Sequence, residues 1–418
     1  MTAKNLRFLI VVIIAALFGY WVGVSKVSYD WKNYHPNIQV TSKEPPASLA
    51  KIDMTNFWAV FERLEEKYYD PTVTDPSTMV NGAINGMVQS LGDPFTVYLP
   101  PAKNTDFKQG MAGEFSGIGA ELSQDGKSIV VISPLDGSPA EQAGIKPGDT
   151  ILKINGNSTD GMTVDQAVTK IRGPKGTTVL LTVRHKDSSK LADLSITRNV
   201  ITVKSVSGWV KPVSDIGTVE MKDDKNDSVM YIRLSQFGDN TNKDWVALVN
   251  KLVLQARDQK NFKGVVFDLR QNPGGYLTDA VFIASEFIKS GTVVIQDNGK
   301  GQQERMDVSR TGLLTNYPVM VLIDGGSASA AEIVSGALRD HGRAKLVGEK
   351  SYGKGTVQEA EDLGNGAGLH VTVAKWLTPN GTWVHKKGLT PDITVKLDPK
   401  KPTVDLQLQK AIETLLKG

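Results

Sequence analysis

Hydrophobic and polar positions divide the chain into segments with different periods. Residues 8–24 form an unbroken apolar run, which would extend about 25 Å as a helix and so nearly span a bilayer. Lys4 and Arg7 precede the run, and positive charge before a spanning segment favours a cytoplasmic amino terminus. No Ala-x-Ala cleavage pattern follows, so residues 1–25 are predicted as a retained single-pass membrane anchor, with a cleaved signal peptide as the alternative. Either interpretation places the remainder on the extracytoplasmic side, in the periplasm or at the cell exterior.

The next two segments are polar and then helical in pattern. Residues 26–51 are interrupted by prolines and are predicted as a linker. In residues 52–113 apolar side chains recur at helical spacing, first between Phe57 and Tyr68 and then between Val80 and Leu91. We expect an N-terminal helical region that packs on the core.

Residues 114–200 change to short strands with Gly and Pro turns. An ordered set of segments stands out: Gly117-Ile118-Gly119-Ala120, Ser138-Pro-Ala-Glu-Gln-Ala-Gly144 and Gly148-Asp-Thr-Ile-Leu-Lys-Ile-Asn-Gly156. This set resembles a PDZ domain, whose carboxylate-binding loop falls on Gly117, Ile118, Gly119 and Ala120. Glycines let backbone N–H groups converge on a terminal carboxylate while an extended peptide adds beside the next strand. We expect this segment to bind the C-termini of proteins or peptides, with apolar end residues.

Buried strands alternate with helices in residues 201–398. The expected elements are strands at Val229–Leu234, Gly264–Leu269 and Pro318–Ile323, and helices at Tyr276–Ser290 and Ala330–Arg339. This alternation predicts an α/β construction with a layered core. Residues 399–418 are predicted to form a C-terminal helix docked on that core.

Composition narrows the chemistry. The 418 residues include no cysteine, which excludes thiol catalysis and disulfides, and the five histidines are scattered without a metal-binding pattern. We therefore expect no metal site. A net charge of +3 gives no argument for nucleic acid, which we do not expect as a partner.

One strand–turn–helix segment carries a candidate nucleophile. Residues 319–332 run from an apolar strand through a Gly-Gly turn into a helix. This geometry would lift a serine clear of a sheet and place it at a helix N-terminus, where N–H groups can stabilise an oxyanion. Ser327 and Ser329 both lie in the turn, and serine is also a frequent helix cap. Taken alone, the segment fits capping better than catalysis.

Lys354 shifts the balance toward catalysis. It lies between Gly353 and Gly355 in a loop. A solvated lysine is almost fully protonated at neutral pH, so it accepts a serine proton only where burial lowers its pKa. The GxxxxGK match at residues 348–354 lacks the Ser or Thr of a phosphate-binding loop. The SxxK match at residues 351–354 lies among glycines that disfavour the helical turn it requires.

Several motifs in residues 55–396 together resemble the carboxyl-terminal processing (tail-specific) serine peptidases. They are Gly92-Asp-Pro-Phe-Thr-Val-Tyr98, Asp268-Leu-Arg-Gln-Asn-Pro-Gly-Gly275, Gly326-Ser-Ala-Ser-Ala-Ala-Glu332, Asp340-His-Gly-Arg343, Gly353-Lys-Gly-Thr-Val-Gln358 and Gly388-Leu-Thr-Pro-Asp-Ile393. The resemblance implies a multidomain α/β protein: a ClpP/crotonase-like catalytic core with an inserted PDZ domain. It also implies a serine endopeptidase that works through an acyl-enzyme, without metal or cofactor.

The resemblance assigns roles to individual residues. The nucleophile falls on Ser329 and the general base on Lys354, while Gln358 would orient the lysine and Asp340 would have a structural or supporting role. The implied oxyanion donors are the backbone N–H groups of Gly274, Gly275 and Ala330.

Two positions depart from the family pattern, and two alternatives concern single residues. Ala331 stands where another serine is frequent, and Asp324 where asparagine is common; neither belongs to the inferred dyad. Ser327 is a rival nucleophile, although the register of the motif favours the later serine. His341 follows Asp340, but adjacent helical residues point in different directions, so we expect a surface histidine at the helix end.

A protein on the same fold that binds without cleaving is the main functional alternative. The core also resembles retinoid-binding repeats that hold apolar ligands, so a non-catalytic peptide- or ligand-binding protein fits the fold. The presence of both Ser329 and Lys354 argues against it. The membrane is an expected partner through residues 1–25, and a homo-oligomer or a regulatory partner is compatible with the sequence.

Overall fold

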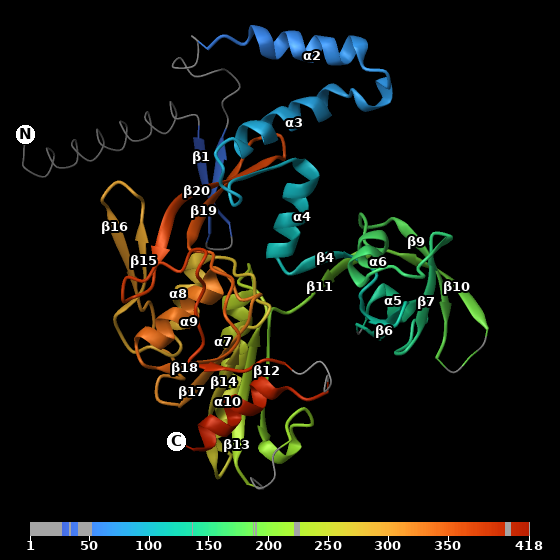
Figure 1. Cartoon of the computed structure of the whole chain (residues 1–418). Coiled ribbons are helices and arrows are strands. Elements are labelled where there is room, and N and C mark those ends of the chain that lie inside the picture. Colours follow the sequence, from blue (N-terminus) through green and yellow to red (C-terminus); the bar gives the residue numbers. More distant parts are fainter. Residues whose placement is uncertain are drawn as a thin grey trace, which may run out of the picture. The chain divides into compact units, whose positions relative to one another are not determined.

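The computed structural model describes residues 27–32, 35–40, 52–135, 137–186, 188, 190–220, 226–397 and 403–417. The chain forms two compact units: Gln109–Ser205 is one, and the residues up to Lys108 combine with Val206–Gly418 to form the other (Figure 1). The smaller unit is thus inserted into the chain of the larger one. The anchor predicted at residues 1–25 lies outside the described residues. Among the residues that are described, no helix combines the length and the apolar character that a membrane span needs.

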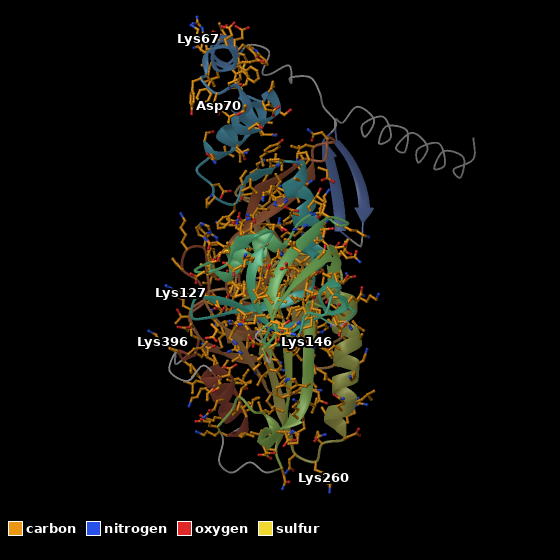
Figure 2. All side chains as sticks on the ribbon, turned by 90° about the vertical axis from the view of Figure 1, so that its right-hand side faces the viewer. Lys67, Asp70, Lys127, Lys146, Lys260 and Lys396 are labelled. Carbon is orange, nitrogen blue, oxygen red and sulfur yellow. The ribbon has the colours of Figure 1, made fainter. Side chains whose placement is uncertain are left out.

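Residues 52–113 contain three helices, α2 (Thr55–Lys67), α3 (Pro76–Gln89) and α4 (Pro101–Met111). The expected packing on the core is only partial: no residue of α2 is buried, whereas Val88 of α3 joins a small cluster with Tyr98 and Ala367. The N-cap residue of α3 is Asp75, whose carboxylate accepts from the N–H of Thr78. Lys67 and Asp70 lie at the turn between α2 and α3 (Figure 2). The short strand β3 (Val97–Leu99) connects the region to the rest of the large unit by pairing with β20 (Gly368–Leu377).

Part of the predicted linker is ordered as strands. β1 (Val27–Lys32) and β2 (His35–Val40) pair with each other, and β2 also pairs with β19 (Thr356–Asp362). They extend a sheet in the order β1-β2-β19-β20-β15-β16, where β15 is Thr292–Asp297 and β16 is Gln303–Asp307. The polar composition of residues 26–51 gave no indication of these strands. A strand added at the edge of a sheet is stabilised by backbone pairing, so it needs no apolar face of its own.

The centre of the large unit is a sheet in the order β12-β13-β14-β17-β18-β21. Its strands are β12 (Val206–Pro212), β13 (Ser228–Leu234), β14 (Phe262–Asp268), β17 (Val319–Ile323), β18 (Ala344–Gly348) and β21 (Ile393–Thr394). All neighbouring pairs are parallel except β12 with β13. The three strands predicted here are confirmed, each within a few residues of its expected bounds.

Helices cover both faces of this sheet, which confirms the layered core. Along β14, Val265 and Phe267 join the cluster made with α7 (Thr241–Arg257), α8 (Leu277–Ala284) and α9 (Ala330–Asp340), whereas Val266 joins the cluster made with α10 (Leu406–Leu416). This alternation follows from the two-residue period of a strand. The predicted C-terminal helix is therefore present and docked.

Helix α8 is shorter than predicted. The pattern predicted a helix over Tyr276–Ser290, but the helix ends at Ala284. The hydroxyl of Ser285 donates to the carbonyl of Val281, and the N–H groups of the following two residues bond three residues back instead of four. These tighter turns end the α-helix although the apolar pattern continues.

The smaller unit contains the predicted short strands and helices. Its strands are β4 (Glu114–Gly117), β5 (Ala120–Asp125), β6 (Ser128–Pro134), β7 (Thr150–Ile154), β8 (Asn157–Ser158), β9 (Thr178–Arg184), β10 (Leu191–Thr197) and β11 (Asn199–Thr202). Its helices are α5 (Pro139–Gln142) and α6 (Val164–Ile171). The unit has its own apolar core, to which Ile129, Ile151 and Leu181 contribute.

Candidate active site

Ser329 occupies a strained position at the start of α9. Its φ of 53° and ψ of −115° lie outside the regions that residues with a side chain prefer. Gly274, at φ 98°, lies directly against it: a Cβ added there would come within 2.8 Å of both the Ser329 Cβ and the Ala328 carbonyl oxygen. The fold therefore holds Ser329 half-buried beside the Gly274–Gly275 turn.

Ser327, the rival nucleophile, is committed to the structure of the turn. Its side chain is fully buried. The hydroxyl donates to the Leu269 carbonyl at 2.8 Å and accepts from the Asp324 N–H at 3.0 Å. These contacts connect the nucleophile turn to the end of β14, and they favour Ser329 over Ser327 as the reacting serine.

Lys354 lies in the loop between β18 and β19, half-buried in the large unit. Burial lowers the pKa of Lys354 below its ordinary value, and the negative charge of Asp93 acts in the opposite direction. The Nζ atom lies 5.1 Å from the centre of the Phe95 ring. Among the contacts of the described residues, no hydrogen bond joins Lys354 Nζ to Ser329 Oγ.

Two indole groups fix the backbone of the lysine loop. Trp376 Nε1 donates to the carbonyl of Lys354 at 2.9 Å, and Trp383 Nε1 donates to the carbonyl of Gly355 at 2.8 Å. Trp376 itself is fully buried. Because both carbonyls are held, the direction in which the Lys354 side chain leaves the backbone is set by the core.

Three residues near Lys354 were missed as individual site residues. Asp93 and Phe95 belong to a motif to which the sequence assigned no chemical role, and His370 was treated as one of several scattered histidines. Burial alone would raise the pKa of Asp93, but hydrogen bonds with Thr372 and other groups hold it below its usual range. The pKa of His370 is lowered by burial and by the charge of Lys354. The pairing of β3 with β20, the strand that carries His370, brings the Asp93–Phe95 segment to this part of the structure.

Gln358, predicted to orient the lysine, contacts two threonines. Its Nε2 donates to Thr356 Oγ1 at 2.9 Å and to Thr372 Oγ1 at 3.0 Å. In the described structure it makes no hydrogen bond with Lys354. Oε1 is the acceptor atom of the Gln358 amide, so it is the atom that can accept from the lysine ammonium.

The three predicted oxyanion donors differ in their backbone contacts. The N–H of Gly274 donates to Asn272 Oδ1 at 2.8 Å, so it is already engaged. Gly275 forms a parallel bridge with Phe237 through the carbonyl of Gly274 and the N–H of the following residue, which leaves its own N–H directed away from that strand. Within the described structure the N–H groups of Gly275 and Ala330 have no hydrogen-bond partner, so they fit an oxyanion best.

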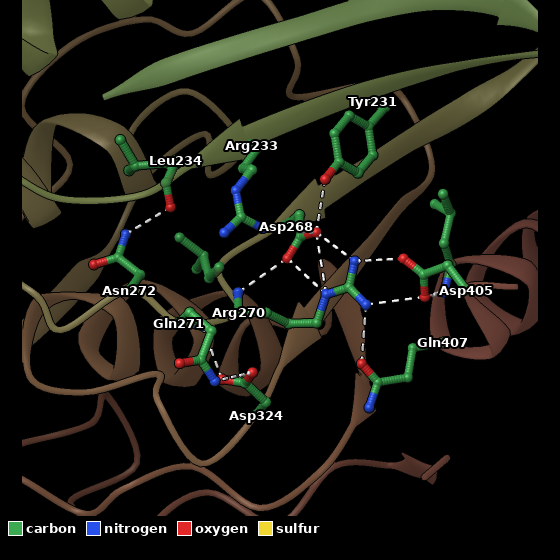
Figure 3. A network of polar contacts seen from close by, with 12 residues as sticks. Tyr231, Arg233, Leu234, Asp268, Arg270, Gln271, Asn272, Asp324, Asp405 and Gln407 are labelled. Carbon is green, nitrogen blue, oxygen red and sulfur yellow. Dashed lines mark hydrogen bonds and ion pairs between the residues drawn. The ribbon is translucent and has the colours of Figure 1, made fainter. Parts of the chain in front are cut away.

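A polar network holds the segment that leads to the Gly274–Gly275 turn against the C-terminal helix (Figure 3). Asp268 is fully buried at the end of β14 and accepts from Arg270 Nη2 at 2.6 Å and from Tyr231 Oη at 2.7 Å. Arg270 also donates to both oxygens of Asp405, the N-cap of α10, and to Gln407. The network thus joins β13, β14 and α10 beside the candidate site.

Asp324, one departure from the family pattern, links the two turns of the site. Its Oδ1 accepts from the N–H of Gln271 at 2.9 Å and from that of Gly326 at 2.9 Å. Its Oδ2 accepts from Gln271 Nε2 at 2.7 Å. An asparagine could accept the same backbone N–H groups through its amide oxygen, so the departure leaves the geometry intact.

Asp340 and His341 lie at the end of α9 and make separate contacts. Asp340 Oδ2 accepts from the N–H of Asn380, in the turn that precedes Trp383. This contact connects the end of α9 to the turn before Trp383, the residue that holds the Gly355 carbonyl. His341 is half-buried rather than on the surface as expected, because its Nε2 lies 2.7 Å from the carbonyl oxygen of Thr292. Among the described residues no group of three or more His, Cys, Asp or Glu side chains is arranged to hold a metal ion.

The predicted peptide-binding residues form one loop between β4 and β5. Ile118 is buried, and its carbonyl accepts from the N–H of Ala140. Gly119 has a φ of 75° and lies so close to Ser138 that a Cβ would approach the Ser138 Cβ to 2.5 Å. Gly117 is the last residue of β4 and Ala120 is the first residue of β5. The loop is therefore held in one conformation by its own unit.

Comparison with known proteins gives three family matches along the chain. Residues 228–395 match peptidase family S41, residues 106–184 match the PDZ domain, and residues 12–103 match the activating protease CtpB N-terminal domain. The first match contains the candidate nucleophile and base, and the second contains the predicted peptide-binding loop.

Curated relatives and solved structures agree with these matches. The carboxy-terminal processing protease CtpA of Bacillus subtilis is 38% identical over 349 residues, 83% of this chain and 70% of that protein. A carboxy-terminal-processing protease of Bartonella bacilliformis is 39% identical over 345 residues, 82% of this chain and 75% of that protein. The photosystem II D1 C-terminal processing protease has a TM-score of 0.51 at 27% identity, covering 86% of this chain and 96% of its own. A putative S41 protease from Bacteroides fragilis, at 15% identity and a TM-score of 0.56, shares the fold over 86% of this chain and 96% of its own. The chain therefore belongs to the carboxy-terminal processing proteases, serine peptidases of family S41, and carries a PDZ domain.

Proposed function

We propose that the protein is an endopeptidase that cleaves peptide bonds with a Ser329–Lys354 dyad. The observation that carries this proposal is the strained backbone of Ser329, which lies directly against Gly274. The same unit contains Lys354, whose pKa is lowered by burial. A serine hydroxyl is a weak nucleophile until a neighbouring base removes its proton. Lys354 is the candidate base because burial favours its neutral form.

The reaction would proceed in two acyl-transfer steps. Neutral Lys354 takes the proton of Ser329 Oγ, and the oxygen attacks the peptide carbonyl to form a tetrahedral intermediate. The N–H groups of Gly275 and Ala330 stabilise the negative charge that develops on the carbonyl oxygen. Lys354 returns the proton to the departing amine, and water then hydrolyses the acyl-enzyme by the same route. Gln358 would orient the lysine through Oε1.

The PDZ domain supplies substrate recognition in this proposal. Its loop at residues 117–120 would bind the C-terminal carboxylate of a protein or peptide with an apolar end residue, as the backbone N–H groups of such loops do. The layered core, with helices on both faces of a largely parallel sheet, supports the ClpP/crotonase-like assignment of the catalytic unit.

We also propose that residues 1–25 anchor the protein in the cell membrane, with the catalytic unit on the extracytoplasmic side. The apolar run and the positive charges before it support this topology. Protease added to intact spheroplasts should digest the catalytic unit, and alkaline washing should leave the chain in the membrane. Recovery of the mature chain in the soluble fraction would favour the cleaved signal peptide.

Cleavage of an unfolded protein with an apolar C-terminus tests the proposed activity. Full-length protein in detergent should cut it, while Ser329→Ala and Lys354→Ala should lose at least about a thousandfold in kcat, as removal of a nucleophile or its base does. Lys350→Ala, at an exposed lysine in the same loop, is the matched control and should keep activity. Cleavage that survives Ser329→Ala would sink the assignment. Binding without cleavage in the wild type, at any pH, would favour the non-catalytic alternative.

A further inference from the structure

We infer that Glu332 is a positioning residue. It fixes the turn that carries Ser329 (the nucleophile turn) relative to the loop that carries Lys354 (the lysine loop). The inference rests on the proposed Ser329–Lys354 dyad. Glu332 lies in the first turn of α9 and is fully buried. None of the roles assigned from the sequence involves it.

The carboxylate accepts hydrogen bonds from both parts of the site. Oε2 accepts from the N–H of Ser329 at 2.9 Å and from the N–H of Lys354 at 2.8 Å. Oε1 accepts from the N–H of Gly353 at 2.7 Å and from the hydroxyl of Ser351 at 2.6 Å. A single oxygen atom therefore connects the backbone of the candidate nucleophile to the backbone of its candidate base.

Helix capping explains only one of these contacts. A glutamate at the third helical position commonly accepts from the N–H of the N-cap residue, and the Ser329 contact has this form. The contacts with Ser351, Gly353 and Lys354 come from a loop beyond β18 and have no part in capping. They add a connection between two segments that a cap alone would leave independent.

The four contacts suit an acceptor-only carboxylate. An ionised carboxyl group accepts hydrogen bonds and has about four lone-pair sites, which four donors can fill. A protonated carboxyl would carry an O–H donor at this place, and an amide would carry an N–H donor, where the carboxylate only accepts. The nearby N-terminus of α9 also favours negative charge at this position. The pattern is thus specific for glutamate rather than for any polar side chain.

Loss of the carboxylate should loosen one side of the lysine loop. Trp376 and Trp383 would still hold the carbonyls of Lys354 and Gly355 from the other side. The loop would remain near its place, but the position of Lys354 relative to Ser329 would no longer be fixed. A misplacement of about 1 Å in a reacting group can lower the rate of reaction about a hundredfold.

Glu332→Gln in the full-length protein tests the inference, because glutamine has the same shape and lacks the charge. We expect kcat for a peptide substrate to fall about a hundredfold while KM changes by less than about threefold. Phosphonylation of Ser329 by a fluorophosphonate should slow in parallel. The pH at which activity reaches half its maximum should also move, because the position of Lys354 changes; a purely structural role would not move it.

Glu286→Gln is the matched control. Glu286 is also almost fully buried in the same unit, where it accepts from Trp245 Nε1 and forms an ion pair with Arg310. It lies outside the proposed machinery, so its substitution should lower the midpoint of thermal unfolding and leave kcat per folded molecule unchanged. This comparison separates a general cost of disturbing a buried carboxylate from a change in the position of Lys354 relative to Ser329.

Several outcomes would overturn the inference. A folded Glu332→Gln protein with kcat within about threefold of wild type would do so. If that variant does not fold, Glu332→Asp repeats the test, because its shorter side chain keeps the charge but cannot reach both segments. Loss of folding in both variants would also overturn the inference, since Glu332 would then act on stability. Undiminished cleavage by Ser329→Ala or Lys354→Ala would instead refute the proposed dyad itself.

Discussion

At the scale of single residues, the proposed mechanism depends on the protonation state of Lys354. Burial lowers its pKa, while the charge of Asp93 raises it, so the neutral fraction reflects the balance of the two. The Phe95 ring beside Nζ also favours the charged form, as aromatic faces do with cations. A lysine can act as a general base only in its neutral form, so the activity should increase with pH until Lys354 has lost its proton.

Asp93→Asn should shift the pH profile of kcat/KM to lower pH. Removing the negative charge removes an influence that raises the pKa of Lys354, so the neutral base becomes available at a lower pH. The profile is measured from pH 5 to 10 with a fluorogenic peptide. Asp106→Asn, at an exposed carboxylate of α4, should leave the profile unchanged. A shift to higher pH in Asp93→Asn would contradict this account of the lysine.

Gly274→Ala should lower kcat at least about a hundredfold, comparable to loss of an oxyanion donor. The added methyl group would meet the Ala328 carbonyl and the Ser329 Cβ at 2.8 Å, and neither can move without disturbing the nucleophile. Gly299→Ala is the control, because Gly299 also has positive φ but has open space around it. Steady-state kinetics of both variants provide the measurement, and equal kcat values would argue against a close approach of the two turns.

At the scale of elements, the site depends on contacts between segments that are distant in the chain. Figure 3 shows how Arg270 connects the end of β14 to the N-cap of α10. The sequence predicted both the strand and the helix, and it placed Arg270 within a motif. It could not predict that Asp405 would be the partner, because such pairing depends on how α10 packs across the sheet. The tie through Glu332 and the approach of Asp93 to the lysine escaped prediction for the same reason.

Asp405→Asn should lower the free energy of unfolding by about 3 kcal/mol, the usual cost of breaking a largely buried ion pair. Hydrogen bonds with Arg270 hold the pKa of Asp405 below its usual value, although burial alone would raise it. The carboxylate therefore stabilises the fold above the ordinary Asp pKa, and this contribution disappears as the pH falls through the lowered value. Urea unfolding at pH 7 and pH 3 measures the effect, which should be largest at pH 7. Glu413→Gln, which breaks a more exposed pair in the same helix, should cost less than about 1 kcal/mol.

Asp279, in α8, should make stability fall as the pH rises. Burial raises the pKa of Asp279 to about 7, with a further increase from the charge of Asp239. The folded state then favours the protonated form, so each pH unit between about 4 and 7 should cost up to about 1.4 kcal/mol. Asp279→Asn should remove this dependence and be more stable than wild type at pH 8. Parallel pH dependences of the two proteins in chemical unfolding would show that Asp279 does not titrate in this range.

At the scale of the whole molecule, the proposed recognition and the proposed chemistry belong to separate units. The PDZ domain has its own core and its own candidate loop for a terminal carboxylate, and the large unit contains all candidates for catalysis. The sequence placed the PDZ-like segment at residues 114–200 from turn spacing and strand alternation, which are local properties, and the smaller unit runs over Gln109–Ser205. The sequence did not predict strands β1 and β2, whose pairing depends on the edge of a sheet that the rest of the chain forms.

The two units should fail independently when their loops are altered. Gly119→Ala should weaken binding of a fluorescent peptide with a free apolar C-terminus, because the methyl group would collide with Ser138. Gly126→Ala, at a roomy position with positive φ in the same unit, should not. Ser329→Ala should bind the peptide as wild type does. Anisotropy titrations measure all three, and an amidated peptide that binds as tightly as the free acid would contradict carboxylate recognition.

The central claim is that Ser329, activated by Lys354, is the residue that forms the covalent intermediate. The most direct measurement is to treat the full-length protein with a fluorophosphonate and to locate the adduct by peptide mass spectrometry. We expect modification at Ser329 only, at a rate that increases with pH, and at least about a hundredfold slower modification in Lys354→Ala. An adduct on Ser327, or an unchanged rate in Lys354→Ala, would contradict the account.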